Sequence, residues 1–217
     1  MKAGIIFITT LAISFLSLTI FAQERTVQGT VLGINGALEQ ASIIDLNSNT
    51  KILSNASGKF SLTIPLAPTH LKFTYKKMQK VVLVSEFDKD ITVTLVPNDK
   101  KLYKEVCERQ EIRLCDIYID HYPEGKYTNQ VSELKEKLFF IEAYNIAASQ
   151  FTDTALQNYL LLYPQGIYRQ KALDAIEIAA WQKARFNHTA NSYQEYLNQY
   201  PDGKAAKLAK EKLAEFK

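Results

Sequence analysis

A pattern of tyrosine, proline and glycine occurs three times in the C-terminal half of the chain, within residues 103–217. Its copies are Tyr118-x3-Tyr122-Pro123-x-Gly125-x-Tyr127, Tyr159-x3-Tyr163-Pro164-x-Gly166-x-Tyr168 and Tyr196-x3-Tyr200-Pro201-x-Gly203. The prolines are 41 and 37 residues apart, and periods of this size are typical of stacked helical hairpins. The repeat therefore predicts an all-α stack of helical hairpins.

Each copy of the pattern should join a short helix to a longer one. A residue that precedes proline is pushed out of the α region, so the short helix should end at the Tyr-Pro step. The glycine of each copy would then permit a tight reversal with unusual backbone angles. We expect long helices at about 126–149 and 167–185, with Thr152 and Thr189 as N-caps of the short helices that follow.

Aromatic side chains recur at fixed places in these units. Aligning the prolines superposes Tyr103, Tyr144 and Trp181, which would each begin a unit. The first two tyrosines of each pattern lie four residues apart, so they share one face of the short helix. Fixed positions favour packing between hairpins with a wet hydroxyl end. The alternative is an exposed platform on which sugars or peptides stack.

The N-terminal half shows a period of two, which is typical of half-buried strands. The alternating stretches are Val27-x-Gly29-x-Val31, Phe60-x-Leu62-x-Ile64, Leu71-x-Phe73-x-Tyr75 and Ile91-x-Val93-x-Leu95. Turn signals such as Asn35-Gly36 and Ser57-Gly58 separate them. About seven short strands at this spacing predict a small antiparallel β-sandwich.

The period changes from two to a helical one near Pro97. Proline cannot donate to a strand ladder, and Asn98-Asp99 favours a turn or a helix cap. We place the boundary at 97–100, between a sandwich domain of residues 23–98 and a helical domain of residues 99–217.

Five stretches of the sandwich half match the pattern of one known family. They are Gly29-Thr30-Val31, Asn35-Gly36, Ala41-Ser42-Ile43-Ile44, Ser57-Gly58-Lys59-Phe60-Ser61-Leu62 and Ile91-Thr92-Val93-Thr94-Leu95. Across residues 26–96 the chain resembles the carboxypeptidase regulatory-like domain, a transthyretin-like sandwich, although Glu39-Gln40 stands where such domains often have Pro-Gly. The family is common at the N-termini of secreted and outer-membrane proteins of Gram-negative bacteria, including TonB-dependent receptors. It implies a structural or adhesive module without peptidase activity.

The triplicated Tyr-Pro-x-Gly pattern of residues 103–217 resembles the tetratricopeptide-type helical repeats of bacterial envelope proteins. In those repeats Tyr-Pro-x-Gly/Ser-x-Tyr/Ala closes each hairpin. The period of 37–41 residues exceeds the family's 34, and Thr152 and Thr189 stand where the family prefers alanine. The resemblance implies protein–protein interaction through a groove rather than chemistry.

The first 22 residues are typical of a secretory signal peptide. Met1-Lys2 gives a short basic start, residues 3–21 are almost entirely apolar, and polar residues follow Ala22. Cleavage is expected after Ala22. The alternative is an uncleaved anchor, because about 20 apolar residues can span a bilayer. Either way, we expect a periplasmic or envelope-associated protein, with the outer membrane as one place of association.

Two cysteines, Cys107 and Cys115, raise the question of a disulfide in an exported protein. On one continuous helix they would lie about 12 Å apart, which is beyond disulfide reach. A break near Arg109-Gln110 would let them face each other across a hairpin. The other interpretation is a pair of buried small hydrophobic side chains.

Three lysines, Lys76, Lys77 and Lys80, cluster around Met78. They could meet an acidic partner. The simpler interpretation is a solvated hairpin end that discourages edge-to-edge strand pairing.

Charge and motifs exclude several function classes. Residues 23–98 carry eight basic and six acidic side chains, and residues 99–217 carry seventeen of each, so neither half has the basic face of a nucleic-acid binder. The sequence lacks a phosphate-binding glycine loop, a zinc motif and a nucleophile elbow, and its histidines, His70, His121 and His188, are scattered. We therefore predict no catalytic, cofactor or metal site.

The leading hypothesis is a non-enzymatic exported envelope protein that acts as an interaction or scaffold module through its helical repeats. Its partner would be a protein that the sequence does not identify. A second hypothesis is a glycan- or cell-wall-binding accessory protein that uses exposed tyrosines. A third is an enzyme with an unrecognised site.

Overall fold

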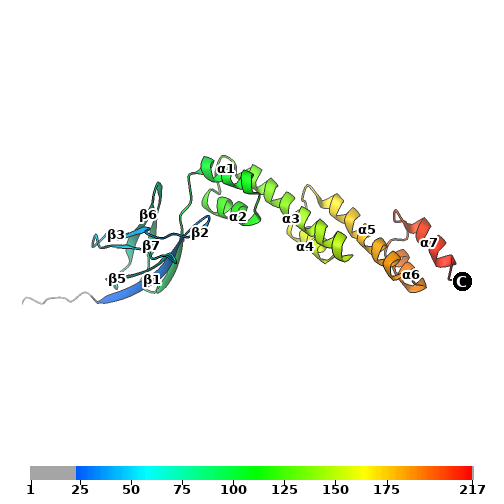
Figure 1. Ribbon diagram of the computed structural model, residues 1–217, viewed down its shortest axis with the longest axis horizontal. Coiled ribbons are helices and arrows are strands. Elements are labelled where there is room, and N and C mark those ends of the chain that lie inside the picture. Colours follow the sequence, from blue (N-terminus) through cyan, green and yellow to red (C-terminus); the bar gives the residue numbers. More distant parts are fainter. Residues whose placement is uncertain (1–22, 217) are drawn as a thin grey trace, which may run out of the picture. The chain divides into compact units, whose positions relative to one another are not determined.

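The computed structural model describes residues 23–216, with strands first and helices after them, as predicted (Figure 1). The chain divides into two compact units between Leu95 and Val96, which we call the β unit and the helical unit. The predicted signal segment, residues 1–22, lies outside the described residues. Among the helices of residues 23–216, none combines the length and the apolar character needed to cross a bilayer.

The described part of the β unit contains eight strands in two four-stranded sheets. The strands are β1 (Glu24–Gly33), β2 (Gly36–Ala37), β3 (Ser42–Asp45), β4 (Lys51–Leu53), β5 (Lys59–Pro65), β6 (Thr69–Tyr75), β7 (Met78–Val84) and β8 (Asp90–Thr94). In one sheet β1 pairs with β5, with β8 and, at its end, with β2; the other sheet has the order β4-β3-β6-β7.

One strand pair departs from the predicted antiparallel arrangement. Strand β8 runs parallel to β1, with Gly29 opposite Ile91 and Val31 opposite Val93. The chain leaves β7 in one sheet and enters β8 in the other, so no hairpin joins β8 to its neighbour. A period of two reports which side chains are buried, not the direction of the neighbouring strand.

The core of the β unit is built from the predicted alternating positions. Phe60, Leu62 and Ile64 are buried while the residues between them are exposed. Leu71 and Phe73 of β6 face them, and the Phe60 and Phe73 rings meet edge to face with centroids 5.6 Å apart. One face of each sheet therefore closes a shared apolar interior.

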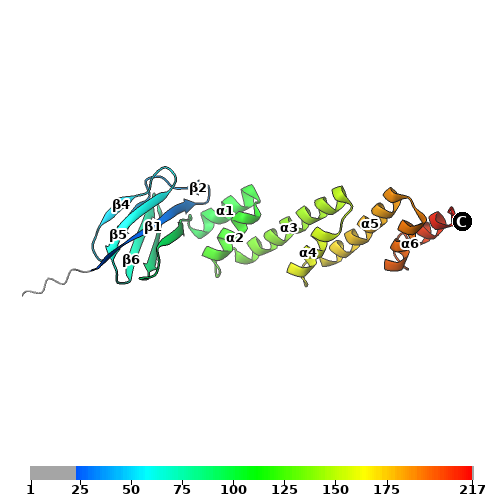
Figure 2. The same cartoon turned by 90° about the horizontal axis from the view of Figure 1, so that it is seen from below.

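Seven helices make up the described helical unit, and the first six form consecutive pairs (Figure 2). They are α1 (Asp99–Arg109), α2 (Ile112–His121), α3 (Thr128–Gln150), α4 (Thr154–Leu162), α5 (Arg169–Asn187), α6 (Ala190–Gln199) and α7 (Ala206–Ala214). Each helix packs against the next one along the chain, and α3 also packs against α5. The predicted stack of helical hairpins is confirmed.

One of the two predicted threonine caps is correct. Thr189 precedes α6, its side chain accepts the N–H of Ser192, and the Ser192 hydroxyl accepts the N–H of Thr189 in return. Thr152 does not have this role, because α4 begins after Asp153 and has no side-chain cap.

The helices α1, α3 and α5 end in residues with left-handed backbone, Gln110, Phe151 and His188. Such a backbone costs an L-residue about 1–2 kcal/mol, whereas glycine adopts it freely. We expect Gln110→Gly to stabilise the helical unit by about 0.5–1 kcal/mol, since the looser unfolded chain offsets part of the gain. The single tryptophan, Trp181, lies in this unit, so its fluorescence during urea unfolding measures the effect. A Gln110→Ala variant of equal or greater stability would contradict this expectation.

Candidate functional site

The repeated pattern builds a three-part joint, which we call the tyrosine clamp. In each copy, the hydroxyl of the first tyrosine donates to a carboxylate on the preceding helix of its pair. The same hydroxyl accepts the backbone N–H of the second residue after the glycine, where the next pair begins. The clamps pair Tyr118 with Asp99, Tyr159 with Glu136 and Tyr196 with Glu177. Each clamp thus ties one helix pair to the start of the next.

The middle clamp is the most buried of the three. Tyr159 is fully buried and Glu136 is 8% exposed. The Tyr159 hydroxyl donates to Glu136 Oε1 at 2.7 Å. The N–H of Tyr168 donates to both, at 3.2 Å to the Tyr159 oxygen and at 3.4 Å to Glu136 Oε1. These bonds offset the large desolvation penalty of an ionised carboxylate in the interior.

The first and third clamps, Tyr118–Asp99 and Tyr196–Glu177, use half-buried carboxylates. Lys126 N–H donates to Asp99 Oδ2 at 3.1 Å, and Lys204 N–H donates to Glu177 Oε1. The Tyr196 hydroxyl donates to the same oxygen of Glu177 at 2.9 Å. Asp99 and Glu177 retain contact with solvent, so water can replace a lost partner there more readily than at the middle clamp.

The clamps keep their tyrosines protonated. Burial is the largest cause and the hydrogen bond to the carboxylate is the second. Together they raise the pKa of Tyr118 and the pKa of Tyr196 to about 12, and they raise the pKa of Tyr159 as well. A neutral hydroxyl is what a carboxylate needs as a hydrogen-bond donor.

Glycine is required in each clamp because a side chain would not fit there. A Cβ at Gly166 would lie 2.4 Å from Glu136 Oε1 and 2.6 Å from the Tyr159 oxygen. At Gly125 and Gly203 the distance to the clamp hydroxyl would be 2.8 Å. The prediction of unusual backbone angles is wrong, since none of these three glycines has a positive φ.

The proline and glycine of each pattern form a β-turn. The N–H of Gly166 donates to the Tyr163 carbonyl at 3.0 Å, and the other two copies repeat this bond. A bond from the fourth residue to the first, with proline second, is typical of a type I turn. The short helices end at the C-cap residues Tyr122, Tyr163 and Tyr200, directly before Pro123, Pro164 and Pro201. The predicted helix end at the Tyr-Pro step is confirmed.

Phe140, not Tyr144, occupies the place equivalent to Tyr103 and Trp181. All three lie four residues after a clamp carboxylate. Phe140 stacks on the ring of Tyr168 with centroids 4.9 Å apart, as Tyr103 stacks on Tyr127 at 4.1 Å. Tyr144 is 45% exposed, so its predicted place between hairpins is wrong.

An extra helical turn explains the misassignment of Tyr144. Helix α3 has 23 residues and α5 has 19. Phe140 lies eleven residues before the left-handed Phe151, whereas Trp181 lies seven residues before the left-handed His188. The four additional residues therefore follow the clamp carboxylate of α3. They account for the difference between the periods of 41 and 37 residues. Because the extra turn lies between Phe140 and the next proline, an alignment on the prolines is displaced by one turn and superposes Tyr144 in place of Phe140.

Exposed apolar side chains gather beside a groove between α3 and α5, which we call the α3–α5 groove. It encloses about 40 Å³ and is lined by Tyr144, Ala147, Ala148, Ala175, Ile178, Ala179 and Gln182. Ile178 is 45% exposed and Ile141, one turn before Tyr144, is 42% exposed. The alanines give the groove a narrow floor, and the larger apolar side chains form its rim.

A wider hollow lies beside α1. It encloses about 520 Å³ and is lined by Asn98, Lys100, Lys101, Tyr103, Lys104, Cys107 and Tyr127. The stacked Tyr103 and Tyr127 rings form its apolar wall, and the lysines are exposed. The Lys126 ammonium lies 5.6 Å from the centre of the Tyr127 ring.

The two cysteines have different environments and both are free thiols. The helix does break between them, at Gln110. Cys115 is buried, which raises its pKa to about 11, whereas Cys107 is exposed. The interpretation as buried hydrophobic side chains therefore holds for Cys115 alone, and the structure contains no bond between the two.

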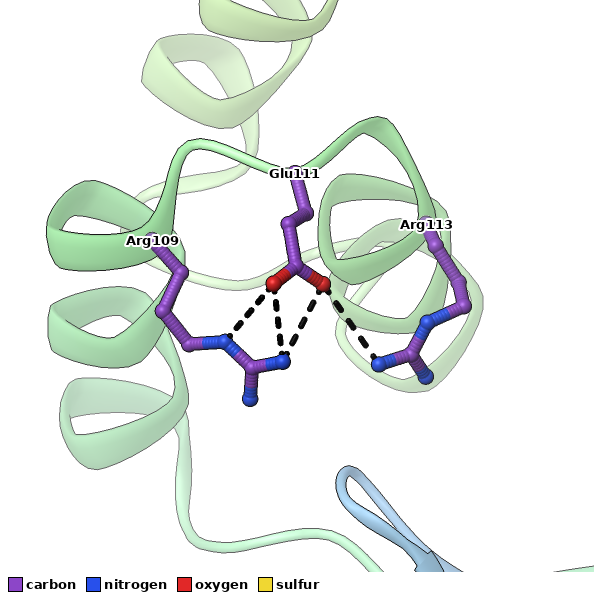
Figure 3. A network of polar contacts seen from close by, with 3 residues as sticks. All are labelled: Arg109, Glu111 and Arg113. Carbon is purple, nitrogen blue, oxygen red and sulfur yellow. Dashed lines mark hydrogen bonds and ion pairs between the residues drawn. The ribbon is translucent and has the colours of Figure 1, made fainter.

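An arginine–glutamate network holds the turn between α1 and α2 (Figure 3). Arg109 Nη2 donates to both Glu111 oxygens, at 2.8 and 3.1 Å. Arg113 approaches Glu111 Oε2 at 3.6 Å from the other side. These groups are partly exposed, so the network orients the turn more than it adds stability.

The histidines and acidic residues do not form a metal site in the described chain. Nδ1 of His121 lies 2.9 Å from the Ile117 carbonyl oxygen, and Nδ1 of His188 lies 2.8 Å from the Tyr193 hydroxyl. In residues 23–216, no three His, Cys, Asp or Glu side chains are placed to hold a metal ion together.

Comparison with models of known protein families gave no match for this sequence. A search of curated proteins also gave none. What the chain does must therefore be inferred from its own residues.

Reasoning from the sequence missed the clamp carboxylates Asp99, Glu136 and Glu177. A single acidic residue in a helix is ordinarily a solvated one. The signal that could have found them is recurrence: Glu136 and Glu177 each lie eleven residues after the glycine of the pattern. All three also precede a large aromatic residue by four positions.

Proposed function

We propose that this chain is an exported, non-enzymatic protein of the bacterial cell envelope that binds a protein partner through its helical repeats. The α3–α5 groove is the observation that carries the proposal. Tyr144 and Ile178, which line the groove, and Ile141, one turn before Tyr144 on α3, are all more than 40% exposed, although the helical unit buries comparable side chains at its joints. Exposed apolar clusters on soluble proteins commonly mark interaction sites.

The family resemblances of the two units support the envelope assignment. Residues 26–96 resemble the carboxypeptidase regulatory-like domain, and two packed sheets agree with that sandwich fold. The repeated Tyr-Pro-x-Gly turns resemble tetratricopeptide-type repeats, and consecutive helix pairs agree with that architecture. The signal-like residues 1–22 support export.

The buried carboxylate of Glu136 supports a non-catalytic role for the helical unit. Glu136 is the clamp carboxylate with the least exposure, and Tyr159 and a backbone N–H already occupy it. A catalytic carboxylate would need an approach for substrate. Binding and scaffolding therefore fit these residues better than catalysis.

The test compares partner capture from envelope extract by the wild-type protein and by a double variant, Ile141→Glu with Ile178→Glu. One charge in the groove at Ile178 and one beside it at Ile141 should weaken binding of the captured partner by at least about tenfold, because a buried unpaired charge is costly at an interface. Titration of the identified partner by calorimetry measures the change.

The matched control is Leu161→Glu. Leu161 is 77% exposed on α4 and does not line the groove, so this variant should bind as the wild type does. Equal binding by the groove variant, or loss with the control alone, would overturn the assignment to the groove. A partner that proves to be a glycan, lost on Tyr144→Ala, would replace the protein partner with the second hypothesis.

A further inference from the structure

We propose that strand β7 is a dimerisation edge, at which a second copy of this chain adds its own β7 antiparallel to the first. The surface belongs to the β unit and is independent of the groove on the helical unit.

Among residues 23–216, strand β7 has one partner along its whole length. It pairs with β6 from Thr69–Val84 to Tyr75–Met78, and it is the last strand in the order of its sheet. A two-residue loop, in which Lys76 has a φ of 53°, joins the strands. In such a hairpin the flanking pair is hydrogen-bonded and bonding alternates along the strand. The N–H and C=O groups of Gln79, Val81 and Leu83 therefore point to the free edge.

The C-terminal half of the free edge is apolar, whereas Gln79 and Lys80 in its N-terminal half are polar and exposed. Val81 is 50% exposed and Leu83 is 59% exposed. Phe87, just past the strand, is 80% exposed. An edge of seven residues with such side chains is a template for another strand. Short length, a bulge or a proline would normally prevent this pairing, and β7 has no proline.

The charges on either side of β7 favour a second copy as the occupant. The loop before the strand carries Lys76 and Lys77, and the segment between β7 and β8 carries Glu86 and Asp88. A twofold antiparallel pairing centred on Val81 sets Gln79 opposite Leu83 of the second copy. The same register brings Lys76 opposite Glu86, twice in the dimer, because the axis exchanges the two ends of the strand.

The lysines then have two effects. In a parallel pairing, Lys76, Lys77 and Lys80 of two copies would repel each other, which is the protection expected of basic residues at an edge. In the antiparallel register, the basic end meets the acidic end. Opposite charges of this kind fix orientation and register more than they add affinity.

Sedimentation equilibrium of the whole protein over a wide concentration range tests the dimer. Val81→Pro removes an outward N–H without touching a β6 bond, so it should raise the dissociation constant at least about tenfold. If circular dichroism shows that this variant does not fold, Val81→Lys replaces it with the same expected result. The control is Leu53→Lys, at a 48% exposed residue of β4 on the opposite edge, which should leave dimerisation unchanged.

A charge exchange tests the register. Lys76→Glu and Glu86→Lys should each weaken the dimer, and the double variant should restore it. A protein that stays monomeric throughout would overturn the proposal. So would a dimer that persists in both Val81 variants, or a double variant no better than the singles. Binding of an acidic peptide by a monomer, lost on Lys76→Glu, would assign the edge to a different partner.

Discussion

Replacing Gly166 with alanine should destabilise the helical unit by about 3 kcal/mol or more. The added Cβ would lie 2.4 Å from Glu136 Oε1, 2.6 Å from the Tyr159 oxygen and 2.9 Å from Tyr163 Cβ. Glu136 and Tyr159 are both buried and bonded to each other. Neither can move away without breaking the clamp, so the variant combines overpacking with the loss of a partner for a buried charge.

Urea unfolding followed by Trp181 fluorescence measures this loss in the helical unit. The matched variant is Gly203→Ala, whose Cβ would lie 2.6 Å from Glu177 Oε1. Because Glu177 is half-buried, its carboxylate can turn toward water, and we expect a clearly smaller loss. Equal losses at the two glycines would show that burial of the carboxylate is not what sets the penalty.

The second large effect is expected from Tyr159→Phe. The substitution keeps the ring but leaves Glu136 with the 3.4 Å hydrogen bond from the Tyr168 N–H as its remaining bond in the clamp. A buried charged group that loses a hydrogen-bond donor typically costs about 2–3 kcal/mol. Tyr196→Phe should cost about 1 kcal/mol, because Glu177 can bind water instead. The same unfolding measurement compares them, and a larger loss at Tyr196 would contradict this ranking.

The clamp tyrosines also predict how stability changes at alkaline pH. Tyrosine in the unfolded chain ionises near pH 10, whereas burial and Glu177 raise the pKa of folded Tyr196 to about 12. The folded state therefore holds the proton more tightly. The stabilisation is complete below pH 10 and is lost as the pH rises from 10 through about 12. Tyr196→Phe should flatten this loss, and Tyr144→Phe, at an exposed tyrosine, should not.

The sequence was most informative where burial alone decides structure. Alternating apolar residues at Phe60, Leu62 and Ile64 predicted a strand because every second side chain is buried. It was silent on the direction of β8, because Ile91 and Val93 would alternate in the same way beside a parallel or an antiparallel neighbour.

The clamps were harder to predict because they depend on how closely separate segments of the chain approach one another, which a residue pattern does not record. The turn glycines suggested unusual backbone angles, which is the commonest reason for glycine in a turn. Their role became visible once Glu136 and Tyr159 could be seen within reach of a Cβ at Gly166. Nothing in a single helical sequence distinguishes Glu136 from its solvated neighbours until its partner is known.

The surplus turn of α3 lies outside all three clamps, between Phe140 and Phe151. The helix pair α3–α4 can thus be longer by a full turn while the tyrosine clamps keep the same hydrogen bonds. The residues from Tyr144 to Ala148, which sit in that stretch, supply one wall of the α3–α5 groove. The segment of α3 that forms the clamp and the segment that lines the groove are therefore separate, so substitutions at the proposed binding surface can leave the joints between helix pairs unchanged.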